Sequence, residues 1–288
     1  MENSTNENEK ALLPAGENNN TLLPVSSDFV FKLIFGDARN IDVLAEFLKS
    51  VLRLSEDEYS HLTIIDPHVK KESEDDKYGI LDVKAHTKNK KVIHIEIQLK
   101  IFKEMQARVI FGQSKMVTEQ IKSGQGYSVI KPVISIIIAG ENFVQDDNEA
   151  NNTRYHYQFR HRTEDGIEFT DLIETNVLEL SKLPTNEEDT DLWYWMKFIK
   201  SDDKEVLNMI AERSPQMKKA VGVLKELSAD ERTRMLYEAR EMARMDGEAR
   251  VRDGIIGVAK NFLNLGLPTE QIAAGTGLTY DEIESLRT

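Results

Sequence analysis

Cysteine is absent from the 288-residue chain. Its absence excludes disulfides, a thiol nucleophile and a cysteine-based zinc site. Long hydrophobic runs are also absent, since the longest, "VISIIIAG" near residue 135, is far too short to span a bilayer. The N-terminus is polar and acidic and does not look like a signal peptide. We therefore expect a soluble, cytoplasmic protein with no membrane partner.

Nucleotide-binding fingerprints are missing as well. Neither a P-loop nor a dinucleotide motif occurs, which argues against ATP-driven chemistry. The histidines have no nucleophile motif beside them, so a serine–histidine–aspartate arrangement has little support. These histidines are His61, His68, His86, His94, His156 and His161.

Charge is distributed unevenly along the chain. The net charge is −13, which argues against a polyanion-binding surface over the whole protein. Residues 77–131, however, contain eleven basic and four acidic residues and carry a net charge of +7. A basic segment in an acidic chain indicates a local electrostatic footprint, although a merely lysine-rich surface would look the same.

The stretch "GILDVKAHTKNKKVIHIEIQ", residues 79–98, predicts a β-hairpin. Apolar and polar residues alternate in both halves, so the polar sets share one face if the apolar sets pack on a core. Pairing residues whose numbers sum to 178 achieves this, with residues 88–90 as a three-residue loop. Asp82 then lies opposite Glu96, Lys84 opposite His94, and His86 opposite Val92.

Two carboxylates opposed in this way repel each other at a Cβ separation of about 5 Å. A divalent cation would remove the repulsion, and hard cations such as Mg²⁺ prefer oxygen ligands. Gln98 follows on the same face and can hold a water molecule. The pattern alone favours the simpler interpretation, a solvated hairpin face with a tolerated charge clash, because polar-out alternation is ordinary.

The elements around the hairpin predict the order helix, three strands, helix, strand. Helices are expected at 28–36 and 40–53, a strand at 61–70 with Pro67 marking an edge, and a helix at 103–123 before the apolar strand near 135. Because the last connection passes through a helix, the final strand can lie parallel to an earlier one. Two more strands are expected, at 155–162 and 171–180.

The remainder of the chain reads as helical from Trp193 onward. "LWYWMKFI" predicts a buried aromatic anchor, with a stacking platform for bases as the less favoured alternative. Residues 229–253 predict a solvated helix with (i, i+4) ion pairs, and three short helices should follow. In the 103–123 helix, Arg108, Lys115 and Lys122 predict a basic stripe that contacts phosphates, or else an ordinary exposed face.

Several stretches, taken in order, resemble the recombination-promoting nucleases, also described as PD-(D/E)XK nuclease family transposases of bacteria. They are "DFVFKLIFG", "EFLKSVL", "GILDVKA", "IHIEIQ", "RVIFGQSKMVTEQIKSGQGYSVIKPVISIII", "TDLIETNVLELSK" and "LWYWMKFI". The resemblance covers roughly residues 25–288. It implies an α/β, restriction-endonuclease-like αβββαβ core with a mixed sheet, followed by a helical C-terminal region.

The resemblance also implies a metal-dependent DNA endonuclease, linked to recombination or mobile elements, that acts on double-stranded DNA with Mg²⁺ or Mn²⁺. Asp82 and Glu96 would be metal ligands, with the backbone carbonyl of Ile97 as a third. Gln98 stands where such sites carry lysine, and Lys84 could supply the missing charge. Glu46 is a further candidate acid, although a plain solvated glutamate is as good an interpretation.

Four parts are expected along the chain. They are a disordered segment at 1–24, a PD-(D/E)XK nuclease-like domain at 25–185, a helical extension at 186–253 and a helix-turn-helix-like segment at 254–288. The tail at 266–288 has a net charge of −3, which favours a protein contact or a homo-oligomer over a DNA reader. The rival hypothesis is a catalytically inactive DNA- or protein-binding regulatory protein.

Overall fold

The computed structural model of the protein describes residues 21–65, 83–145 and 154–287. In this part of the chain the strands form one six-stranded sheet in the order β1-β2-β3-β4-β6-β5. The strands are β1 (Thr63–Ile65), β2 (Val83–His86), β3 (Val92–Gln98), β4 (Val133–Ala139), β5 (His156–Arg162) and β6 (Glu168–Glu179).

The sheet is mixed, because β1, β2 and β3 pair antiparallel whereas β3, β4 and β6 run parallel. Strand β5 returns antiparallel to β6 at the far edge. The connection from β3 to β4 passes through helix α4 (Met105–Thr118), as parallel neighbours require. The expected α/β core with a mixed sheet is confirmed, including the parallel placement of the apolar strand β4.

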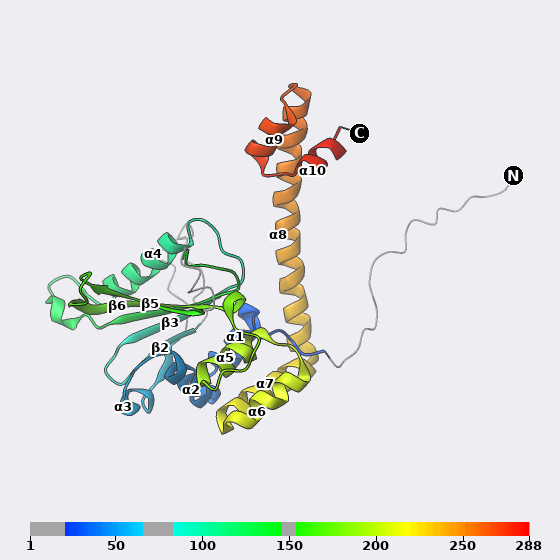
Figure 1. Ribbon diagram of the computed structural model, residues 1–288. Coiled ribbons are helices and arrows are strands. Elements are labelled where there is room, and N and C mark those ends of the chain that lie inside the picture. The colour runs from blue at the N-terminus through cyan, green and yellow to red at the C-terminus, as the bar shows by residue number, and fades with distance from the viewer. Residues whose placement is uncertain (1–20, 66–82, 146–153, 288) are drawn as a thin grey trace. The chain divides into compact units, whose positions relative to one another are not determined.

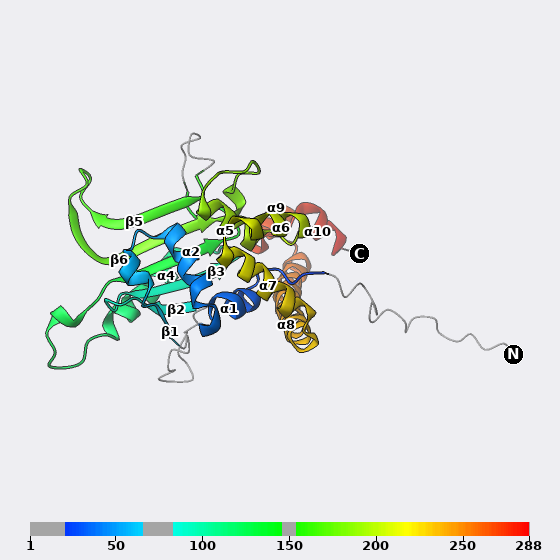
Figure 2. The ribbon, with the colours of Figure 1, turned by 90° about the horizontal axis from the view of Figure 1, so that it is seen from below.

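Helices cover both faces of the sheet (Figure 1). Helix α4 lies on one face, and α1 (Asp28–Phe35), α2 (Ile41–Val51) and α5 (Asp191–Lys200) lie on the other. Seen from below, the second layer lies in front of the strands, with α6 (Lys204–Arg213) and α7 (Pro215–Ala229) beside it (Figure 2). Short helical turns occur at α3 (Glu56–Tyr59), Ala38–Asn40, Tyr127–Val129 and Leu180–Lys182.

The predicted aromatic anchor is confirmed in α5. Trp195 is fully buried, and its ring centroid lies 5.8 Å from that of Phe35 and 6.1 Å from that of Phe47. Such edge-to-face contacts join α5 to α1 and α2 in one core. A stacking platform for bases would need exposed rings, so that alternative is wrong.

Both faces of β3 are buried for most of its length, and the expectation of a half-buried strand is therefore wrong. Ile93, Ile95 and Ile97 face the layer of α1 and α2, as the alternation predicts. The other face lies under α4, and His94 on that face is only 4% exposed. Alternation identified the polar face of the strand, but it could not reveal the helix that covers that face.

The chain divides into two compact units, and the boundary along the sequence falls between Asp230 and Glu231. In the second, α8 (Glu231–Asn264) is followed by α9 (Thr269–Thr276) and α10 (Tyr280–Ser285). Ala259, Ile272 and Ile283 form its small core. Thr279 and Glu282 form a capping box at the start of α10, and Arg244 pairs with Glu248 at 2.8 Å in the (i, i+4) manner expected.

The first helix of this second unit is longer than the sequence pattern indicated. One continuous helix runs from Glu231 to Asn264, although a break was expected after residue 253. The segment nevertheless stays helical because Ile255, Phe262 and Leu263 pack against the core of α9 and α10.

Candidate active site

The hairpin that carries the predicted site has the predicted register. Lys84 pairs with His94 and His86 with Val92, so the residue numbers sum to 178 throughout β2 and β3. The loop closes through Thr87 and Lys91, and Lys90 has a left-handed φ of 65°. A residue in this conformation commonly ends a three-residue hairpin loop. Asp82, the first predicted metal ligand, lies outside the described residues.

Glu96 lies on the α4 face of β3 and pairs with Arg108 of α4. Its Oε1 is 2.8 Å from Nη2 of Arg108, and its side chain is only 12% exposed. Burial raises the pKa of Glu96 above its usual range, and the nearby Arg108 acts in the opposite direction. The arginine thus fixes the orientation of a carboxylate that is otherwise largely removed from water.

A row of polar side chains crosses the sheet beside Glu96, under α4. Lys84, His94, Ser135 and Thr175 are neighbours in register on β2, β3, β4 and β6. Gln113 of α4 donates from Nε2 to Oγ1 of Thr175 at 2.9 Å. Such a row is unusual beneath a helix, because buried polar atoms normally need partners.

His94 is the most deeply buried titratable member of this row. Burial, together with the nearby Lys84 and Arg108, lowers its pKa to about 3, so the ring is neutral at physiological pH. Among the described residues, neither Nε2 of His94 nor Oγ of Ser135 has a hydrogen-bond partner. Sequence patterns had not predicted this row as a unit. Two features of the sequence point to the row. Ser135 interrupts an otherwise apolar strand, and Gln113 interrupts the apolar side of α4.

Lys84 lies on the same face of the sheet as Glu96, but its side chain extends toward the C-terminal end of α4. Its Nζ is 4.0 Å from Oε2 of Glu119, just beyond the helix, and its side chain is 16% exposed. Gln98 lies two residues beyond Glu96, and its Nε2 donates to the backbone carbonyl of Lys100 at 3.0 Å. Both predicted polar neighbours of the site therefore have partners of their own.

Gly140 sets the spacing between β3 and β4 next to the site. Its N–H donates to the carbonyl of Gln98 at 3.0 Å. A Cβ at position 140 would lie 2.4 Å from the carbonyl oxygen of Leu99 and 2.8 Å from its Cα. Only glycine allows this approach, so residue 140 helps to position the strand end that carries Gln98.

The predicted basic stripe is not continuous, because α4 ends at Thr118 rather than near residue 123. Gln120 explains the early end, since its side chain bonds both the N–H and the carbonyl of Lys131 and turns the chain away. Lys115 is half-buried on the helix, whereas Lys122 lies beyond it and is exposed. Of the three predicted phosphate contacts, Arg108 is the one that lies against Glu96.

Glu46 and Ile97 occupy different places relative to this face. Glu46 is half-buried on α2, in the layer opposite α4 (Figure 1). Ile97 follows Glu96 on β3 and has a buried side chain. Its backbone carbonyl and the carboxylate of Glu96 are oxygen donors of the type that Mg²⁺ prefers. Among the described residues, no group of three histidine, cysteine, aspartate or glutamate side chains could hold a metal ion. A site for Mg²⁺ therefore fits these donors only if Asp82 completes it.

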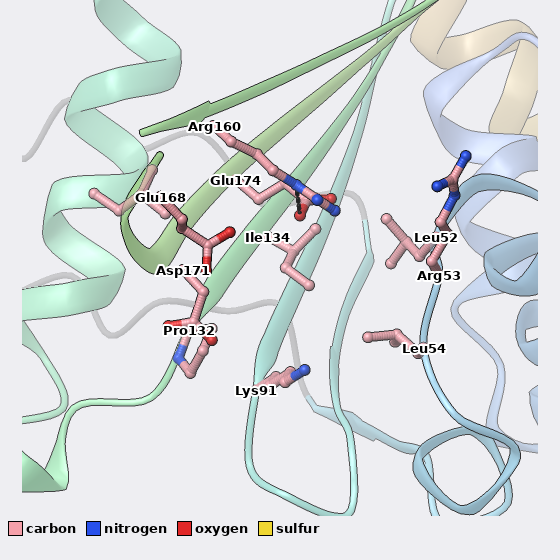
Figure 3. A pocket seen from close by; sticks show the side chains of 11 residues that line it. Leu52, Arg53, Leu54, Lys91, Pro132, Ile134, Arg160, Glu168, Asp171 and Glu174 are labelled. Carbon is pink, nitrogen blue, oxygen red and sulfur yellow. Dashed lines mark hydrogen bonds and ion pairs between the residues drawn. The ribbon is translucent and has the colours of Figure 1, made fainter. Parts of the chain in front are cut away.

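A pocket of about 150 Å³ lies elsewhere, on the α2 side of the sheet and near the start of β3 and β4 (Figure 3). Arg53 and Leu54 line it from the chain that follows α2, and Arg160 pairs there with Glu174 at 2.8 Å. Ile134, another lining residue, pairs with Ile93 and not with Glu96. The pocket is therefore separate from the α4 face.

The model of the PD-(D/E)XK nuclease family transposases matches residues 25–254. The chain belongs to this family. The expected resemblance is thereby confirmed, and membership supports a nuclease or transposase-related role for the protein. Searches of curated proteins and of solved structures returned no match. In the described part of the chain, no helix of this family member is both long and apolar enough to cross a membrane.

Proposed function

We propose that the protein is a metal-dependent DNA endonuclease, which hydrolyses phosphodiester bonds of double-stranded DNA in recombination or mobile-element activity. The observation that carries the proposal is the buried Glu96 on a hairpin of the predicted register. Continued by one pair, that register would set Asp82 opposite Glu96. Membership of a nuclease family agrees with this interpretation.

In this proposal Asp82, Glu96 and the carbonyl of Ile97 hold Mg²⁺ or Mn²⁺. The bound cation would lower the pKa of a water molecule and stabilise charge on the phosphate. The protein's own contribution is to hold Glu96 in one orientation through Arg108 and to limit water around it. Gln98 can orient a water molecule but carries no charge.

The other proposed residues act around this centre. Lys84 adds positive charge to the same face, and Lys115 and Lys122 attract the DNA backbone. Glu46 stays a candidate acid, although its helix α2 lies in the layer opposite α4. The acidic C-terminal helices are proposed to bind a protein partner or a second copy of the chain, since a net charge of −3 in residues 266–288 disfavours DNA.

Cleavage of supercoiled plasmid in Mg²⁺ tests the proposal. We expect wild-type protein to nick or linearise the plasmid, and we expect Asp82→Ala and a chelator each to abolish the cleavage. Equal activity in wild type and Asp82→Ala would place the chemistry elsewhere. Absence of cleavage in both Mg²⁺ and Mn²⁺ would favour the inactive binding protein, with the Glu96–Arg108 pair as a purely structural contact.

A further inference from the structure

The active face of β3 lacks a cation on the strand itself. Gln98 stands where PD-(D/E)XK sites commonly carry lysine, and its amide nitrogen donates to the carbonyl of Lys100 at 3.0 Å. A neutral amide in this position cannot offset the negative charge of an approaching phosphate. The charge that a lysine would add there, beside that of the proposed metal ion, then has to come from another side chain.

Lys84 is one candidate for this role, but its position does not favour it. It lies opposite His94, one residue pair away from the position opposite Glu96. Its ammonium group is 4.0 Å from Glu119 and its side chain is 84% buried by the surrounding residues. The charge of Lys84 is therefore directed toward the end of α4.

Arg108 combines contact with Glu96 and access from solvent. One guanidinium nitrogen is 2.8 Å from Oε1 of Glu96, yet the arginine side chain is 46% exposed, compared with 12% for the glutamate. The guanidinium carbon also lies 6.0 Å from the centre of the Phe102 ring, which limits the orientations of the side chain. The guanidinium therefore covers the carboxylate on one side and is open on the other.

We propose that Arg108 provides the positive charge that Gln98 lacks, with its guanidinium anchored on Glu96 and presented to a DNA phosphate. The inference rests on the proposed endonuclease function and names the residue that contacts the substrate's phosphate at that site. Arginine suits the role because its planar fork carries five N–H donors, so one edge can bind a carboxylate while another binds a phosphate. Lysine has a single charged centre and does not span both partners in the same way.

A rescue experiment tests this assignment through single-turnover cleavage of plasmid DNA. Arg108→Gln should lower the rate by about 10²-fold or more, the effect of removing one charge-stabilising donor. The double variant with Gln98→Lys should recover at least about tenfold over Arg108→Gln, since a lysine at position 98 restores a cation beside Glu96.

Binding of a short DNA duplex without divalent metal gives an independent readout. The slope of log affinity against log salt concentration should fall by about one in Arg108→Gln and should recover in the double variant. Arg162→Gln is the matched control, because Arg162 is similarly exposed (42%) and pairs with Glu168 on the β5–β6 hairpin. The control should leave both the salt slope and the cleavage rate unchanged.

Three results would overturn the inference. One is an unchanged rate and salt slope in Arg108→Gln. Another is loss of both without any recovery in the double variant, which would mean that Arg108 only orients Glu96. The third is failure of wild-type protein both to cleave DNA and to bind Mn²⁺ in titration calorimetry, which would remove the proposed function as well. Cleavage by wild type together with either of the first two results would leave that function intact.

Discussion

Individual residues on the α4 face differ in how well sequence could predict them. Glu96 was predictable, because strict alternation along residues 92–98 assigns it to the polar face of a strand. Its partner was not, because the Glu96–Arg108 contact depends on how α4 lies across the sheet. Periodicity reports which residues share a face, but it does not report which element covers that face.

His94 gives a prediction at the scale of a single residue. Its pKa falls from 6.5 to about 3 on burial, so the unfolded chain takes up a proton between these values that the folded protein does not. Stability should therefore rise with pH up to about 6.5. Relative to pH 7.5, this group should lower the free energy of unfolding at pH 5 by about 2 kcal/mol.

Urea unfolding between pH 5 and pH 7.5 checks this expectation. Asparagine at position 94 is polar but does not titrate, so His94→Asn should have a weaker pH dependence than wild type. The same pH dependence of stability in both proteins would mean that folding does not lower the pKa of His94. Proton NMR of the His94 ring, which should not titrate above pH 5, provides a second measurement.

At the scale of elements, the hairpin was predictable in detail and α4 was not. Alternation on both strands permits one register that buries the apolar residues, and that register is observed from Val83 to His86. The end of α4 depends on a tertiary contact between Gln120 and Lys131, which no local pattern contains. The predicted stripe of Arg108, Lys115 and Lys122 requires the helix to continue to residue 123, whereas α4 ends at Thr118.

The junction of β3 and β4 gives a prediction at this scale. Gly140→Ala should separate the two strand ends, because the new Cβ would meet the backbone of Leu99 at 2.4 Å. We expect a loss of about 1–3 kcal/mol in the free energy of unfolding, as for other overpacked sites. Urea denaturation measures the loss.

Gly222→Ala is the matched control for this substitution. Gly222 lies inside α7, and apart from the local backbone of that helix no atom lies within 4 Å of a Cβ placed there. Alanine in a helix interior should increase stability by about 0.5–1 kcal/mol. Gly140→Ala behaving in the same way as Gly222→Ala would show that the strand ends can move apart without loss.

For the whole molecule, composition indicated the helical C-terminal region but not the position of its boundary. The change of pattern near Trp193 reflects the end of the sheet, whereas α5 still packs on Phe35 and Phe47. The boundary between compact units lies later, at Asp230. Contacts between residues distant in sequence decide such a boundary, and local composition does not report them.

A chain that ends at Asp230 should therefore keep the stability of the first unit. Its urea midpoint, followed by tryptophan fluorescence, should match that of the corresponding transition in the full chain, because both tryptophans lie in α5. A chain that ends at Arg213 is the control. It lacks α7, whose Ser228 accepts a hydrogen bond from the N–H of Leu23, and it should be much less stable. A large loss on removing residues 231–288 alone would mean that the two units fold together.

Helix α4 has few buried apolar residues for an element that covers the candidate active face. Met105, Val109 and Met116 pack downward with the polar Gln113 between them, while Ile110 and Phe111 are each 57% exposed. An element with so few buried apolar contacts is expected to open by local fluctuation at a lower free energy than the sheet below it. In hydrogen exchange, the amides of α4 should therefore lose protection before those of β3 and β4. Arg108 would separate from Glu96 in the same event, so the candidate active face would come apart while the rest of the fold stays intact.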